Sequence, residues 1–81
     1  MNVQVRLGPG LATAAGSRRL RVALPPHATV ATLLERVRDL EPAIAAGLDS
    51  ALPVVAGTHA SKEQELADGD EVALVFPVAG G

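Results

Sequence analysis

The spacing of apolar residues changes along the chain, and these changes constrain the fold more than any other feature of the sequence. Residues 2–7 and 19–24 alternate apolar and polar side chains, which is the period of a half-buried strand. Glycines and a proline at 8–10 end the first segment, and residues 11–16 can form one helical turn or so. Because strands joined by such a short connection must be antiparallel, we expect the chain to open with a hairpin. Pro25 and Pro26 end its second strand, since neither can donate a ladder hydrogen bond.

A helical period follows the hairpin. The apolar residues of this segment recur at the spacing of one helical face, namely Val30, Leu33, Leu34, Val37 and Leu40. Thr29 fits an N-cap, and Glu41 before Pro42 marks the end. We therefore predict one main helix, with a further short turn over residues 43–48.

Two later segments return to strand patterns. Residues 51–57 predict a third short strand. Leu66 is expected to be a buried anchor in a loop, and residues 68–70 are expected to form a turn that leads into the last strand. In residues 71–76, Val72, Leu74 and Phe76 alternate with Ala73 and Val75. Both faces of this strand are apolar, as expected for a central strand or for one whose second face meets a partner. The alternation places Phe76, the only aromatic residue, on the core face, where we expect it to be buried.

The order of these elements predicts an α+β roll. A mixed sheet is covered by one main helix, and the last strand lies beside the first, as in the β-grasp (ubiquitin-like) fold. A doubly wound α/β fold fits poorly because only one long helix is present. We expect residues 1–76 to form the β-grasp domain and residues 77–81 a flexible C-terminal tail ending in Gly-Gly.

Composition excludes several classes of function. A net charge of −2 and a single aromatic residue disfavour nucleic-acid binding. The absence of cysteine rules out disulfides and thiolate metal sites. The sequence shows no leader pattern and no apolar run long enough for a bilayer, so a cytoplasmic protein without membrane contact is expected.

The polar motifs favour ordinary structural roles. His27 and His59 do not compose a metal-ligand set and are expected to be solvated loop residues. The acidic residues at 68–71 lack the rest of a calcium loop and are better explained by a turn. No serine has a recognisable catalytic base, so we predict no metal site and no enzymatic activity of the chain alone.

Arginines gather on the predicted hairpin. Arg18, Arg19 and Arg21, together with Arg6, can line its solvent face. Such clusters usually protect an exposed sheet edge or aid solubility. Docking of an acidic partner is the alternative interpretation.

The C-terminal stretch LADGDEVALVFPVAGG, residues 66–81, resembles the end of the ubiquitin-like sulfur carriers of the MoaD/ThiS type. The stretch resembles above all the small subunit of molybdopterin synthase. Residues 5–16, 28–37 and 54–60 resemble this family's opening strand and turn, the start of its main helix and its third strand. This chain departs from the family in four places. The family usually has an aromatic residue at Gly8, often another near Val75, a proline at Phe76 and an asparagine at Ala56.

The tail itself suits activation by ATP. A terminal carboxylate has a pKa of about 3.3–3.7, so at neutral pH it is an anion able to attack the α-phosphate of ATP. Gly80 and Gly81 lack a Cβ and can pass through a narrow channel. Pro77 removes one N–H where the chain leaves the sheet, and Val78 and Ala79 can occupy small apolar pockets.

The resemblance implies a specific function. Gly81 would be adenylated and converted to a thiocarboxylate that donates sulfur in molybdenum cofactor biosynthesis. The implied partners are a ubiquitin-activating-like adenylyltransferase, a sulfur donor protein and the large subunit of molybdopterin synthase. The residues expected to bind partners are His59, Val75, Phe76, Pro77, Val78, Ala79 and Gly80. The chain would be a non-catalytic subunit that binds no cofactor, and ATP and Mg would belong to the activating partner.

Other functions remain open. Thiamine sulfur carriers use the same tail but are typically shorter, and the extra stretch at 42–53 favours the molybdopterin type. A carrier for cysteine synthesis or another pathway, a protein modifier that forms isopeptide bonds through Gly81, and a binding module with an unreactive tail are the alternatives.

Overall fold

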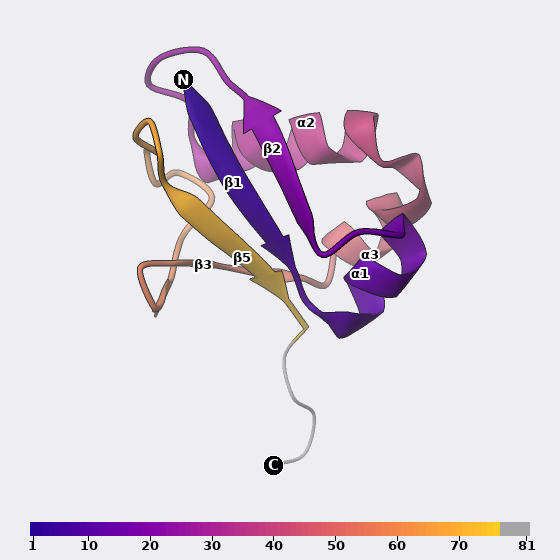
Figure 1. Cartoon of the computed structure of the whole chain (residues 1–81). Helices are drawn as coiled ribbons and strands as arrows, with labels where there is room; N and C mark the ends of the chain where they lie inside the picture. Colours follow the sequence, from indigo (N-terminus) through magenta and orange to yellow (C-terminus); the bar gives the residue numbers. More distant parts are fainter. Residues whose placement is uncertain (77–81) are drawn as a thin grey trace.

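The computed structural model describes residues 1–76, which form a five-stranded sheet with helices on one side (Figure 1). The strands are β1 (Asn2–Leu7), β2 (Arg19–Ala23), β3 (Leu52–Val55), β4 (Thr58–His59) and β5 (Glu71–Val75). The helices are α1 (Pro9–Ala15), α2 (Val30–Leu40), the 3₁₀-helix η1 (Pro42–Ile44) and α3 (Ala45–Leu48). The sheet order is β2-β1-β5-β3-β4.

The first and last strands form the centre of the sheet. β1 pairs with β2 in an antiparallel hairpin and with β5 in parallel, with Leu7 opposite Leu74. β5 pairs in turn with β3, which is antiparallel to it, and β3 continues into the short β4. This confirms the predicted mixed sheet and β-grasp fold, and it explains why β5 is apolar on both faces.

The core lies between the sheet and α2. Val30, Leu33 and Val37 of the helix are buried against inward-facing residues of the strands, among them Val5 and Val72. The apolar face predicted for the helix is longer than the buried face. Leu34 is only partly buried, and Leu40, the last helical residue, is 53% exposed.

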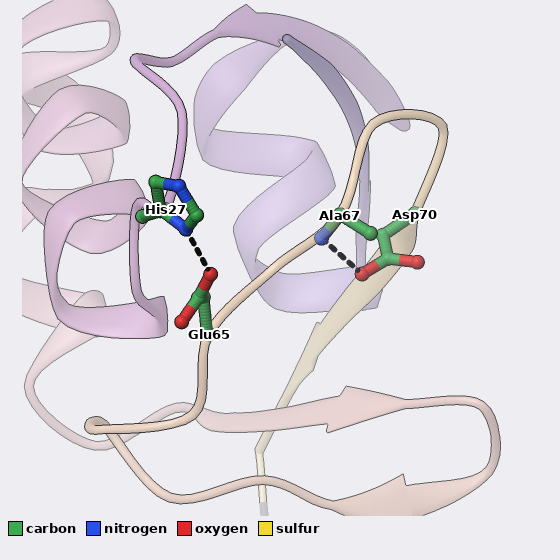
Figure 2. A network of polar contacts seen from close by, with 4 residues as sticks. All are labelled: His27, Glu65, Ala67 and Asp70. Carbon is green, nitrogen blue, oxygen red and sulfur yellow. Dashed lines mark hydrogen bonds and ion pairs between the residues drawn. The ribbon is translucent and has the colours of Figure 1, made fainter.

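Side-chain hydrogen bonds fix the ends of several elements as the sequence predicts. The Thr29 hydroxyl accepts a hydrogen bond from the Thr32 N–H at 3.4 Å and caps α2. The turn before β5 has Gly69 at φ 85°, and the Asp70 carboxylate accepts a hydrogen bond from the Ala67 N–H at 2.8 Å (Figure 2). Leu66 is buried beside this turn, which confirms both the predicted turn and the predicted anchor.

Two local features differ from the expectation. α1 begins at Pro9 and spans seven residues, so the first connection is a longer helix than the single turn expected. The strand β4 is not predicted by the sequence, because two residues are too few to show a period. It follows a two-residue turn in which Ala56 has φ 52° and Gly57 has φ 79°, the positive values that a tight hairpin turn requires.

Candidate functional site

The face of the sheet opposite the helices carries an apolar strip. Residues paired across neighbouring strands share a face, so the pairs Leu52–Val75 and Val54–Ala73 place these four residues together on the open side. Ala73 is only 7% exposed, and the other three are half-buried by their neighbours. This apolar strip therefore runs across β3 and β5, and β5 is the strand that leads into the C-terminal residues.

Two of the residues predicted to bind partners belong to this face. Val75 is the last residue of β5, and His59 pairs with Val54 across β3 and β4. His59 is exposed at the edge of the strip. It lies in a strand and not in a loop, which corrects one part of the expectation, whereas its predicted exposure is confirmed.

Phe76 is not buried, which corrects the sequence prediction. It is 41% exposed, whereas Leu74 and Val72 on the same alternation are fully buried. The reason is the end of β5 at Val75. Phe76 follows the last ladder position, so no neighbouring strand covers its outer side.

Two glycines form a seat under the Phe76 ring. A Cβ placed on Gly10 of α1 would lie 3.0 Å from Cε2 of Phe76, and one on Gly47 of α3 would lie 3.2 Å from Cζ. Both distances are closer than side chains ordinarily allow. Small residues on both helices thus let the ring pack over their backbones, and Phe76 covers the end of the core on the helix side of the sheet.

The predicted reacting end of the chain lies outside the described residues. This concerns Pro77, Val78, Ala79, Gly80 and Gly81, the predicted tail and its predicted acceptor glycine. Among the described residues, Val75 and Phe76 stand next to this segment and His59 lies farther across the sheet.

The contact between His27 and Glu65 is not predicted by the sequence. Nδ1 of His27 lies 2.6 Å from Oε1 of Glu65 and joins the loop before α2 to the loop before β5 (Figure 2). His27 has φ 65°, and its side chain is 84% exposed, as expected for a solvated loop residue. Nothing in the sequence links two residues so far apart, and the pair lies away from the open strip.

The described part of the chain holds neither of two other kinds of site. Within residues 1–76, no three His, Cys, Asp or Glu side chains gather so that they could hold a metal ion. None of the helices in the same residues has the length and apolar character needed to cross a bilayer.

A five-stranded mixed sheet in this order, with helices on one face, is the ubiquitin-like β-grasp fold. The family model of the ThiS family matches residues 10–81. The chain therefore belongs to the ThiS family of ubiquitin-like sulfur carriers, and the resemblance noted in the sequence is confirmed.

Solved structures agree with this assignment. SAMP1 from Haloferax volcanii, a small archaeal modifier protein, is 31% identical over the full length of both chains, with a TM-score of 0.90. A putative molybdopterin converting factor subunit 1 from Pyrococcus furiosus is 26% identical, over 96% of this chain and 99% of that one, with a TM-score of 0.86.

A third similar structure is a complex. It is the BexX/CysO complex of Amycolatopsis orientalis, in which a chain is 25% identical over 98% of this chain and 99% of that one, with a TM-score of 0.77. The comparison with curated proteins gives no match.

Proposed function

We propose that this chain is the sulfur carrier subunit of a molybdopterin synthase and that Gly81 carries the sulfur. The observation that carries the proposal is the ThiS family match, which runs from residue 10 to Gly81 and so includes the Gly-Gly end. The similarity to the Pyrococcus furiosus converting factor subunit supports the molybdopterin pathway.

The chemistry requires one activated carboxylate. An oxygen of the Gly81 carboxylate attacks the α-phosphorus of ATP, and pyrophosphate leaves to give an acyl-adenylate. Sulfur at the oxidation state of sulfide, provided by a donor protein, then attacks the carbonyl carbon and displaces AMP. The thiocarboxylate sulfur then attacks a carbon of the pterin precursor and displaces an oxygen leaving group from it. Water hydrolyses the resulting thioester, which leaves the sulfur on the precursor and restores the Gly81 carboxylate.

The chain supplies no catalytic group in this scheme and acts by presenting its end to partners. An adenylyltransferase of the ubiquitin-activating type holds ATP and Mg, and the large synthase subunit receives the charged tail. The open strip around Val75 and Val54 and the exposed ring of Phe76 offer apolar surface beside the tail for both encounters. All of these steps would take place in the cytoplasm.

A protein modifier is the second candidate. It is favoured by the 31% identity to SAMP1 over both full chains. Activation by ATP would be the same, but Gly81 would end in isopeptide bonds to lysine side chains instead of a free thiocarboxylate.

Mass spectrometry of the intact protein separates the two functions. The chain is incubated with an adenylyltransferase, ATP and a sulfur donor, and then with the large synthase subunit and pterin precursor. A sulfur carrier gains the mass difference between sulfur and oxygen in the first step and loses it in the second. A variant lacking Gly81 is the control. We expect it to fold normally but to gain no mass, because its carboxylate is one residue short of the α-phosphate.

Two results would contradict the carrier function. A chain that gains no mass with any donor is not a sulfur carrier. Gly-Gly remnants on lysines of other proteins after digestion, without a thiocarboxylate intermediate that the synthase consumes, would assign the modifier function.

A further inference from the structure

The net charge of the chain is −2, yet four of its seven lysines and arginines lie on β1, on β2 or directly before β2. Arg6, Arg18, Arg19 and Arg21 are all exposed. In the strand register, Arg6 lies directly opposite Arg19. Like charges in this position oppose strand pairing, so the hairpin carries an arrangement that does not serve its own stability.

A hollow lies between this hairpin and α1. Its volume is about 450 Å³, and its apolar surface comes from Leu7, Pro9 and Ala12, while Arg6, Arg18 and Arg19 provide its charge. No acidic residue lines it. A surface of this kind is complementary to a segment that combines carboxylates with apolar side chains.

The charge of the hollow is poorly balanced within the molecule. Nη1 of Arg6 lies 3.7 Å from Oε1 of Glu71, and both side chains are more than half exposed, so this pair is weak. Within residues 1–76, neither Arg18 nor Arg19 takes part in an ion pair. The two arginines are therefore available to bind an anionic group.

Protection of the sheet edge does not explain the arrangement. β2 is an edge strand, and charges on it alone would be sufficient to discourage pairing with another chain. Arg6, however, lies on β1, inside the sheet, and faces the hollow. Three of the four arginines, Arg6, Arg18 and Arg19, thus line a concavity, and Arg21 lies on the edge strand outside it.

The hollow also lies near the end of β5. Leu7 lines it and pairs with Leu74, and the N–H of the following Gly8 donates a hydrogen bond to the Leu74 carbonyl at 2.8 Å. A protein that holds the chain beyond Phe76 would therefore reach this surface as well.

We propose that this arginine-lined hollow binds an acidic segment of the adenylating partner and positions the carrier for activation. The inference rests on the proposed function only for the identity of the partner. Activation by ATP is common to the sulfur carrier and modifier functions, so the hollow serves in either case.

The test compares two double variants that change the net charge equally. Arg18→Glu/Arg19→Glu reverses the charge of the hollow, and Arg36→Glu/Lys62→Glu reverses two exposed charges elsewhere. The ATP–pyrophosphate exchange rate with the adenylyltransferase gives KM for the carrier and kcat. We expect the first variant to raise KM on the order of tenfold with little change in kcat, and the second to stay close to the wild type.

Thermal unfolding separates binding from folding. Because Arg19→Glu would place a carboxylate opposite Arg6, the hollow variant should be no less stable than the wild type. A raised KM in a stable variant supports the inference. An unchanged KM, or equal changes in both double variants, overturns it.

A second measurement does not depend on the enzyme. The labelled wild-type protein is titrated with a peptide of alternating leucine and glutamate and, separately, with inorganic phosphate, while its backbone amide signals are followed by NMR. The peptide should shift the amides of Thr13, Arg18 and Arg19, with a much weaker effect of phosphate. No shift with the peptide, or equal shifts with phosphate, contradicts the binding of an acidic segment. If the wild type binds the peptide but no adenylyltransferase activates it, the proposed function fails while the acidic-segment site stands.

Discussion

Replacing Phe76 with alanine should cost much less stability than its position in the alternation suggests. A fully buried phenylalanine side chain contributes about 1.5–3 kcal/mol by its removal from water. Phe76 is 41% exposed, so about three-fifths of that contribution applies. Water can fill the space that the ring leaves, so no cavity term is added. We expect Phe76→Ala to lower the free energy of unfolding by about 1–2 kcal/mol.

Leu74→Ala is the matched control, because Leu74 lies two residues earlier on the same face and is fully buried. It should cost about 3–5 kcal/mol, as expected for a buried leucine that leaves a cavity. Both variants can be measured by urea unfolding followed by far-ultraviolet circular dichroism, since the chain has no tryptophan or tyrosine. Equal losses at the two positions would refute the exposed placement of the ring. A loss of stability below about 0.5 kcal/mol for Phe76→Ala would contradict the packing of the Phe76 ring against α1 and α3.

Three further substitutions test other parts of the structure. Gly47→Ala should lower stability by about 1–2 kcal/mol, because the added Cβ would lie 2.8 Å from Cδ2 of the buried Leu11; an unchanged melting temperature would mean that Leu11 moves at no cost. Ala56→Asn should raise stability by about 0.5–1 kcal/mol, because asparagine tolerates φ 52° better than alanine, and a loss would contradict the turn geometry. Val75→Asp should weaken binding of the large synthase subunit on the order of tenfold, as measured by calorimetry. Circular dichroism should show that the variant stays folded, and an unchanged affinity would mean that the open strip is not part of the interface.

Periodic patterns are sufficient to predict most of the fold from the sequence. The alternation in β1 and β2 and the helical spacing in α2 each report which side chains face the core, because burial imposes the period directly. The centre of the sheet follows from the same reasoning, since a strand that is apolar on both faces needs a neighbour on each side. The hairpin turn at Ala56 was missed because its residues lack the usual Asn-Gly signal, although the backbone adopts the same positive φ values.

The site could be predicted only in part. Alternation places Phe76 on the correct face, but its exposure depends on where β5 ends and on how closely Gly10 and Gly47 approach, which are properties of packing. The basic cluster was visible in the sequence as well. Its hollow was not, because the hollow depends on the length and placement of α1.

The parallel pairing of β1 with β5 affects when the protein can fold during its synthesis on the ribosome. The central strand pair joins Gln4 to Glu71, so nearly the entire chain must be synthesised before this pair can form. Contacts so distant in sequence slow folding and leave the early hairpin without its neighbour in the meantime. A chain whose translation stops before Glu71 cannot complete its sheet, and its exposed apolar surface marks it for degradation. The topology thus makes completed synthesis a condition for a folded carrier.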